Sequence, residues 1–129
     1  MRAVLLALVV LVGCGGGGGT TVGPNFVGQW DGGWTGQADS GSLSVSIFPS
    51  TTIGEFCKIT GTMGSVLRGE TGTVSGAISV TGNVFYKVVW PSGRATVAGH
   101  YILSGDSMTG NTVVYTTGSD DPATVSLAR

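Results

Sequence analysis

The chain has 129 residues, of which 41% are hydrophobic, 10% are charged and 24 are glycines, and its formal net charge is −1. This length suits one domain with a single modest core. The charged residues form no basic stripe and no polybasic patch, which argues against nucleic acid and anionic lipid headgroups as partners.

The chain begins with a positive charge followed by a short apolar run. Arg2 precedes AVLLALVVLV, residues 3–12. This run is about half of the roughly 20 residues that a membrane-spanning helix needs, and the glycines that follow are poor helix formers. The pattern is typical of an export signal. The alternative is a buried N-terminal strand, which the glycine tract would separate from the rest of the domain.

A cysteine motif ends the apolar run. Leu11-Val12-Gly13-Cys14 resembles the lipobox of bacterial lipoproteins. The resemblance implies that residues 1–13 are a signal peptide, that Cys14 is the lipidation site, and that the mature protein contacts a membrane through its N-terminal lipid. Gly15 stands where some lipoproteins carry a retaining aspartate. The implied location is therefore the bacterial cell envelope, with the outer membrane favoured if the host has one.

The second cysteine leaves an alternative open. Two cysteines in an exported chain can form a disulfide, here between Cys14 and Cys57. If Cys14 is acylated instead, Cys57 is left alone as a small buried hydrophobe on a strand, or as a reactive thiol. Residues 14–25 are rich in glycine and predict a flexible tether between the lipid and the domain.

Residues 26–129 predict one all-β domain. Apolar residues alternate with polar ones in eight short segments, and no segment shows apolar residues at helical spacing. The alternation predicts one inward-facing set in each segment: Phe26, Trp30 and Trp34; Leu43, Val45 and Ile47; Cys57, Ile59 and Met63; Val74, Ile78 and Val80; Val84, Tyr86, Val88 and Trp90; Val97, Tyr101 and Leu103; Met108, Thr112 and Val114; Val125 and Leu127.

Brief turns separate these segments. The turn signals include Thr81-Gly82-Asn83, Pro91-Ser92-Gly93, Ser104-Gly105-Asp106 and Ser119-Asp120-Asp121-Pro122. Short connections predict sequential antiparallel pairing, and eight such strands can close into an up-and-down barrel. The alternative is a two-sheet β-sandwich, which needs longer crossing connections. Glycines within the predicted strands indicate bulges or sharp bends, at Gly61, Gly76, Gly99 and Gly110.

A second resemblance concerns the barrel itself. Gly28-Gln29-Trp30 resembles the Gly-x-Trp motif of the calycins, the group of lipocalins, fatty-acid-binding proteins and avidins. In lipocalins this tryptophan closes one end of the barrel and packs against an arginine of the last strand. The resemblance therefore implies that Trp30 and Arg129 close the barrel, with Gly32-Gly33-Trp34 as a second register. The short length, and the absence of tryptophan after Trp90, depart from lipocalins and avidins respectively, so biotin is not the expected ligand.

Catalytic groupings are absent from the pattern. His100 is the single histidine and shares the polar parity of its segment, so we expect it to face solvent. No second histidine or cysteine stands at zinc-ligand spacing, and Asp120 and Asp121 lack the series of oxygen ligands that calcium needs. We therefore expect no catalytic residue, no metal site and no cofactor.

Aromatic residues on the inner parity are the remaining candidate for binding. Trp34, Tyr86 and Tyr101 are the predicted ligand-binding residues of a small apolar pocket at the open end of the barrel. The sequence thus favours a lipid-anchored, non-catalytic binding module for a small apolar ligand or an envelope protein. The alternatives are a structural or interaction barrel with a filled interior and, third, a hydrolase, which would need a cleft pairing His100 with Asp106 or Glu70.

Overall fold

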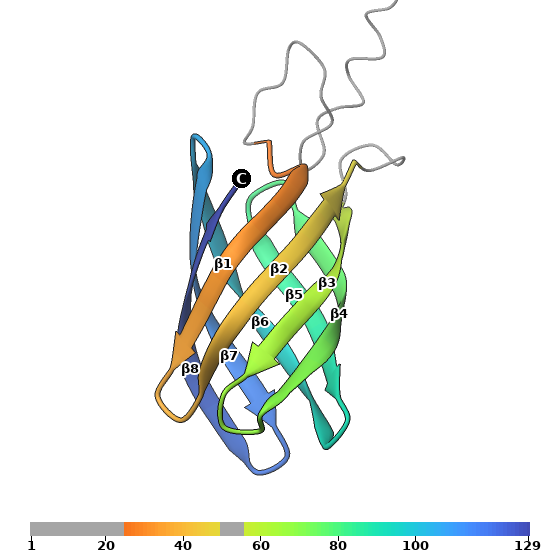
Figure 1. Ribbon diagram of the computed structural model, residues 1–129. Coiled ribbons are helices and arrows are strands. Elements are labelled where there is room, and N and C mark those ends of the chain that lie inside the picture. The colour runs from red at the N-terminus through yellow and green to blue at the C-terminus, as the bar shows by residue number, and fades with distance from the viewer. Residues whose placement is uncertain (1–24, 50–55) are drawn as a thin grey trace, which may run out of the picture.

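The computed structural model describes residues 25–49 and 56–129, which form a closed antiparallel barrel of eight strands (Figure 1). Each strand pairs with the next along the chain, and the first pairs with the last. The predicted up-and-down barrel is confirmed, and the sandwich alternative is wrong. The predicted signal peptide, Cys14 and the tether up to residue 24 lie outside the described residues.

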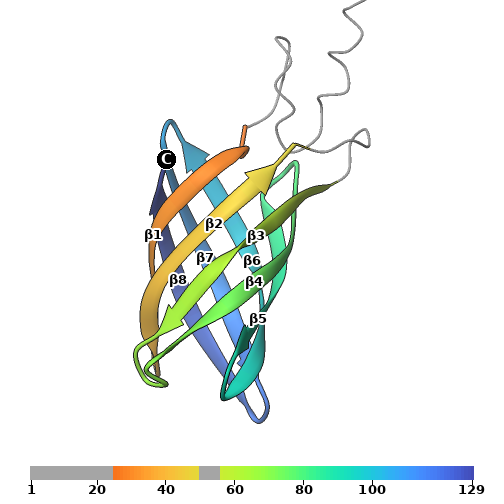
Figure 2. The same ribbon diagram turned by 45° about the vertical axis from the view of Figure 1, so that its right-hand side comes forward.

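The strands are tilted and wrap around a common axis, as Figure 2 shows from a second side. Their bounds are β1 (Gly28–Gly36), β2 (Ser40–Phe48), β3 (Phe56–Ser65), β4 (Glu70–Ser79), β5 (Asn83–Trp90), β6 (Gly93–Ser104), β7 (Ser107–Thr116) and β8 (Ser119–Ala128).

The barrel has two distinct ends. One end, here called the mouth, carries the hairpin turns at residues 37–39, 66–69, 91–92 and 117–118. The opposite end, here called the closed end, carries the start of the described chain at residues 25–27, the turns at 80–82 and 105–106, and Arg129. The N-terminal segment therefore enters the barrel at the end opposite the mouth.

The interior is filled by the side chains of the predicted inward parity. Trp30, Tyr86 and Tyr101 are the largest of the fully buried side chains, each no more than 1% exposed. Aliphatic side chains from β2 to β8 surround them. Serine and threonine dominate the outward positions of β2, β3 and β4, so the two faces of the sheet differ as the period-two pattern predicts.

Two inward glycines make room for the buried tyrosine rings. Gly76 pairs with Tyr86 across β4 and β5, and Gly110 pairs with Tyr101 across β6 and β7. A Cβ atom at Gly76 would lie 2.4 Å from the Cβ of Tyr86, and one at Gly110 would lie 2.4 Å from a ring carbon of Tyr101. Each ladder keeps a single register, so Gly76 and Gly110 are not bulges, one of the two alternatives that the sequence left open beside sharp bends. They provide space for aromatic rings.

One predicted turn is wrong. Ser119-Asp120-Asp121-Pro122 belongs to β8, and the hairpin turns instead at Thr117 and Gly118, where Gly118 has a φ of 82°. A left-handed residue suits glycine because it has no Cβ. Pro122 lies in β8 opposite Val113. It does not interrupt the pairing of β8 with β7, which runs from Ser119 to Ala128.

Among the described residues, no helix has the length and apolar character needed to cross a membrane.

Candidate functional site

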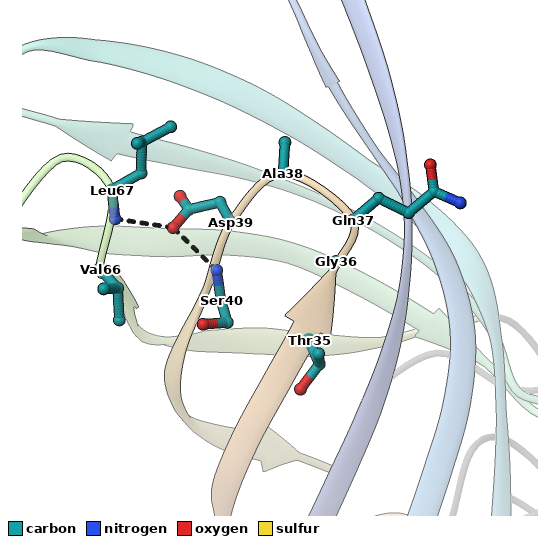
Figure 3. Close-up of a pocket in the computed structure, with 8 residues that line it drawn as sticks. All are labelled: Thr35, Gly36, Gln37, Ala38, Asp39, Ser40, Val66 and Leu67. Atoms are coloured by element: carbon teal, nitrogen blue, oxygen red, sulfur yellow. Dashed lines mark hydrogen bonds between the residues drawn. The ribbon is translucent and has the colours of Figure 1, made fainter.

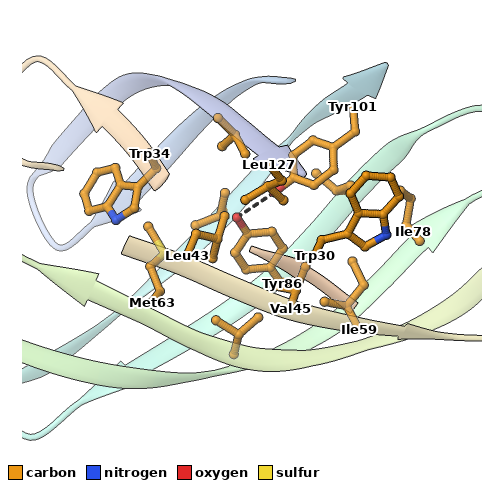
Figure 4. Packing of buried hydrophobic residues seen from close by; sticks show 14 of the residues in the cluster. Trp30, Trp34, Leu43, Val45, Ile59, Met63, Ile78, Tyr86, Tyr101 and Leu127 are labelled. Atoms are coloured by element: carbon orange, nitrogen blue, oxygen red, sulfur yellow. Dashed lines mark hydrogen bonds between the residues drawn. The ribbon is translucent and has the colours of Figure 1, made fainter. Parts of the chain in front are cut away.

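The predicted ligand-binding residues Tyr86 and Tyr101 lie inside the barrel and not on an accessible cavity. Their hydroxyl oxygens are 3.0 Å apart and share a hydrogen bond (Figure 4), and each residue is 1% exposed. Burial raises the pKa of Tyr86 to about 12, although the hydrogen bond to Tyr101 lowers it. Burial and the neighbouring Tyr86 raise the pKa of Tyr101 well above 10. Both rings are therefore neutral and act as core.

The third predicted residue, Trp34, lies apart from the tyrosine pair, at the mouth (Figure 4). Its indole N–H donates to the Gly64 carbonyl oxygen at 2.8 Å, and the indole of Trp90 donates to the Met63 carbonyl oxygen at 3.0 Å. Both acceptors belong to the end of β3. The two hydrogen bonds fix the two rings, which are only 3% and 4% exposed and therefore form packed walls of the mouth.

Trp34 and Trp90 line a cavity of about 260 Å³ between the hairpin turns of the mouth. The cavity is mainly apolar, with leucine, alanine and valine side chains beside the two indoles, and it has a polar rim. Its lining residues are Trp34, Ala38, Asp39, Leu67, Arg68, Trp90, Val114, Thr116, Ser119 and Asp121. This combination of a concave apolar surface and a few placed polar groups is typical of small-ligand sites.

Arg68 supplies the positive charge of this mouth cavity. Its guanidinium carbon lies 4.7 Å from the centroid of the Trp90 ring, and one N–H donates to the Ser92 hydroxyl at 2.7 Å. Ser92 in turn donates to the Glu70 carboxylate at 2.6 Å. The guanidinium is held over the indole, and its other N–H groups have no acceptor among the described residues.

Asp39 ties two turns of the mouth together. Its carboxylate accepts hydrogen bonds from the backbone N–H of Ser40 and of Leu67, both at 2.8 Å (Figure 3), and from the Ser65 hydroxyl. Burial raises the pKa of Asp39, but these hydrogen bonds and the charge of Arg68 outweigh burial and lower it below its usual value. The carboxylate is ionised at neutral pH and fixes the position of Leu67 beside the cavity.

Asp121 fixes the first turn of the mouth from the opposite side. Its carboxylate accepts from the backbone N–H of Gln37 at 2.7 Å and of Ala38 at 3.1 Å. The sequence pattern placed Asp121 in a turn, and this prediction is wrong, because Asp121 is a strand residue that holds a neighbouring loop. Two carboxylates therefore border the mouth cavity together with Arg68.

At the closed end, Trp30 and Arg129 make the contact that the calycin resemblance implied. The guanidinium carbon of Arg129 lies 4.3 Å from the centroid of the Trp30 ring. Arg129 also donates to the carbonyl oxygens of Asn25, Val27 and Gly105. The Trp30 indole N–H donates to the Phe26 carbonyl oxygen at 2.8 Å. The contact is present, whereas the family remains a prediction.

Cys57 differs in part from its prediction. It is fully buried in β3, as expected, but it is disulfide-bonded and not a free thiol. The other cysteine of the sequence is Cys14, which lies outside the described residues. Cys57 is therefore not available as a reactive thiol.

The groups considered for hydrolysis are engaged separately. His100 is exposed, as predicted, and its Nδ1 lies 3.1 Å from the Asn83 side-chain oxygen. Asp106 forms an ion pair with Arg129, and Glu70 accepts from Ser92. Within residues 25–49 and 56–129, no group of three or more histidine, cysteine or acidic side chains could hold a metal ion.

Comparisons with family models, curated proteins and solved structures gave no match to this chain. The candidate site is therefore defined by its own geometry. Of the three residues that the sequence selected for ligand binding, Trp34 lines this cavity. The sequence did not select four others that line it: Trp90, Arg68, Asp39 and Asp121.

Proposed function

We propose that this chain is an exported, lipid-anchored protein of the bacterial cell envelope that acts by binding rather than by catalysis. The observation that carries the proposal is the mouth cavity, where two indoles held by hydrogen bonds border about 260 Å³ of space. The binding residues in this proposal are Trp34 and Trp90, with Arg68 and Leu67 beside them. Tyr86 and Tyr101 support the site as core.

The cavity can be blocked without disturbing the core. Leu67 is 73% exposed and lines the cavity, whereas its neighbour Val66 is 72% exposed and does not. Leu67→Arg places a long charged side chain at the mouth, and Val66→Arg is the matched control. Native mass spectrometry of the protein purified from its host should show a bound small molecule in the wild type and in Val66→Arg, and none in Leu67→Arg. A molecule retained by Leu67→Arg, or none in the wild type, would contradict binding at the mouth.

A second candidate is a structural or interaction barrel without a ligand. The observation that favours it is the filled interior, in which Tyr86 and Tyr101 are sealed from solvent. In this case the wild type and both loop variants would carry no small molecule, and an envelope protein would be the partner.

The anchor is proposed on the lipobox at Leu11–Cys14. The disulfide of Cys57 provides the rival outcome, because one Cys14 sulfur cannot both carry a lipid and form half of a disulfide. Mass spectrometry of the mature N-terminus from native membranes decides between them. An acylated Cys14, and loss of membrane fractionation in Cys14→Ser, would support the anchor. A Cys14–Cys57 peptide pair that separates on reduction would refute it, and would leave an exported binding barrel without a lipid.

A further inference from the structure

We propose that the closed end of the barrel rests on the surface of a lipid bilayer, with the outer wall of β2–β5 as the contact. This inference rests on the proposed lipid anchor and extends it from a tether at Cys14 to a fixed orientation of the barrel. It is carried by three exposed phenylalanine side chains that gather on this wall, at the end where the N-terminal segment enters.

The phenylalanines are distributed unevenly over the barrel. The chain has four of them, and all four lie in the half of the barrel next to the closed end. Phe26 is buried, whereas the other three are between 46% and 55% exposed. Phe48 ends β2, Phe56 begins β3, and Phe85 lies near the start of β5. Phenylalanine is among the residues most often buried, so three exposed rings in one region indicate a contact surface.

The three exposed rings belong to one continuous surface. Lys58 of β3 pairs with Phe48 on one side and with Ala77 on the other. Ala77 in turn pairs with Phe85 of β5. Phe56 is two residues from Lys58 in β3 and therefore points to the same face. Adjacent strands are about 4.8 Å apart, so Phe48 and Phe85 are roughly 15 Å apart along this row. These five residues are here called the closed-end patch.

The charge of this wall suits the interfacial region of a bilayer. The charged residues of β2–β5 are Lys58, Lys87 and Glu70, and Glu70 lies at the mouth. Both lysines are exposed, and neither forms an ion pair among the described residues. Phenylalanine rings can enter the acyl boundary while lysine stems extend to the headgroups. Two lysines are too few to bind anionic lipid by charge alone, so apolar contact must provide most of the affinity.

The mouth also has exposed apolar residues, but its charge is different. Val66 and Leu67 are 72% and 73% exposed in the turn between β3 and β4. The charged residues at this end of the described chain include four carboxylates and two arginines: Asp39, Glu70, Asp120 and Asp121, with Arg68 and Arg94. A bilayer that contains anionic lipid has a negative surface, so this excess of carboxylates disfavours the mouth as the contact.

The position of the N-terminal segment favours a bilayer as the occupant of the patch. The described chain starts at Asn25 at the closed end (Figure 1), and Cys14 stands 11 residues earlier in the sequence. A glycine-rich coil of that length spans roughly 17–20 Å on average. A lipid on Cys14 would therefore keep the closed-end patch within reach of the bilayer and turn a weak contact into an intramolecular one. The mouth would then face away from the membrane.

Paramagnetic lipid headgroups provide the test. We would purify the isotope-labelled mature protein from its host and combine it with phosphatidylcholine nanodiscs in which some headgroups carry chelated Gd³⁺. The backbone N–H signals of Phe48, Phe56 and Phe85 should be broadened more strongly than that of Leu67 at the mouth. They should also be broadened more than that of Ser126, which lies near the closed end on the opposite wall. A barrel that turns freely on its tether would not distinguish the two walls.

A matched pair of substitutions isolates the closed-end patch. Phe56→Ser removes a ring that is 54% exposed, and Tyr115→Ser removes a ring that is 43% exposed near the mouth, so both should leave the core intact. Phe56→Ser should lower the ratio of docked to undocked barrels by roughly three- to tenfold, which corresponds to half of the free energy of burying a phenylalanine side chain. Tyr115→Ser should leave this ratio unchanged. Replacing all three exposed phenylalanines by serine should abolish the selective broadening.

The outcomes separate the lipid contact from the lipid anchor. If Cys14 is not acylated and the selective broadening still appears on mixing with nanodiscs, the anchor is wrong and the contact stands. If Cys14 is acylated and no wall is selectively broadened, or the mouth is broadened most, the contact is wrong and the anchor stands. Without acylation and without broadening, both are wrong. Concentration-dependent broadening of the patch in the absence of nanodiscs would assign it to a second copy of this chain and would overturn the lipid contact.

Discussion

The two ends of the barrel use the same pair of residue types in different ways. At the closed end Arg129 lies over Trp30 at 4.3 Å, and at the mouth Arg68 lies over Trp90 at 4.7 Å. In both cases the indole N–H donates to a backbone carbonyl, of Phe26 and Met63 respectively. The stacked pair by itself therefore does not distinguish a structural contact from a binding site.

The two arginines differ in how many of their N–H donors are used within the barrel. Arg129 donates to three backbone carbonyls and pairs with Asp106, so the closed end consumes its hydrogen-bonding capacity. Arg68 donates to Ser92 and borders a cavity. A cation–π pair is worth about 0.5–1 kcal/mol at an exposed site, so the backbone hydrogen bonds decide which arginine stabilises the fold.

The largest expected effect is a loss of stability on replacing the tryptophan at each end of the barrel. Trp30→Ala removes a fully buried ring from the closed end and should lower the free energy of unfolding by about 3–5 kcal/mol. Trp90→Ala should cost less, because that ring borders a cavity and is 4% exposed, whereas Trp30 is fully buried. Urea unfolding of the two variants measures the difference. An equal or larger loss for Trp90→Ala would mean that the mouth carries as much of the core as the closed end.

The next largest expected loss of stability comes from replacing the arginine at each end. Arg129→Met should lower the free energy of unfolding by about 2–3 kcal/mol, because it leaves the carbonyls of Asn25, Val27 and Gly105 without their charged donor. Arg68→Met should cost less than about 1 kcal/mol, since it loses one hydrogen bond near the surface. Arg129→Lys should restore little, because an ammonium cannot reach separate carbonyls as a planar guanidinium does. Similar losses for both methionine variants would remove the distinction between the two ends.

The period-two pattern predicted most of this fold because the side-chain period of a strand is local. Residues such as Val84, Tyr86 and Val88 reveal their shared face without knowledge of any partner strand. Short connections then leave few ways to pair eight strands, and closure follows. The β7–β8 turn was misplaced because Asp120, Asp121 and Pro122 are typical turn residues, whereas Gly118 alone provides the left-handed conformation.

The candidate site was predicted less completely because it depends on residues from different hairpins. Trp34 lies near the end of β1 and Trp90 ends β5, and in an up-and-down barrel the turns after odd-numbered strands share one end. With this topological rule, the sequence could have predicted that the two tryptophans lie at the same end of the barrel. Nothing local could have shown that Asp121 bonds the backbone at Gln37 and Ala38, since that contact depends on barrel closure between β8 and β1.

The tyrosine pair between the two ends predicts loss of stability at alkaline pH. In the unfolded chain both phenols titrate near pH 10, whereas folding raises their pKa values, that of Tyr86 to about 12. The folded state keeps the two phenolic protons to higher pH than the unfolded chain. The free energy of unfolding is therefore not reduced by these groups below pH 10, and it decreases as the pH rises above 10. Tyr86→Phe should cost about 1–2 kcal/mol at neutral pH by leaving the Tyr101 hydroxyl without its partner.

The double variant isolates this effect. Tyr86→Phe with Tyr101→Phe should cost less than the sum of the single changes and should flatten the decline in unfolding free energy above pH 10. Tyr115→Phe, at a tyrosine that is 43% exposed, is the control and should leave both quantities unchanged. Additive single costs, or the wild-type decline in the double variant, would show that the buried hydroxyls do not act as a pair.

The smallest expected effect concerns two carboxylates. Here the residue at the mouth should contribute more to stability than the residue at the closed end. Asp39 at the mouth accepts from two backbone N–H groups and a hydroxyl, whereas Asp106 at the closed end is 82% exposed and pairs with Arg129 at 3.4 Å. Asp39→Asn should lower the free energy of unfolding by less than about 1 kcal/mol at neutral pH, since solvent screens the site. Asp106→Asn should leave it unchanged within error.

The pH dependence of stability should also reveal the contribution of Asp39. Folding lowers the pKa of Asp39, so its contribution is present above its ordinary value of 3.8 and is lost as the pH falls below it. Urea unfolding between neutral pH and pH 3 should therefore show the wild type converging on Asp39→Asn. A difference that persists in acid would mean that Asp39 acts through the shape of its hydrogen bonds and not through its charge, and that the mouth turns are held without an ionised group.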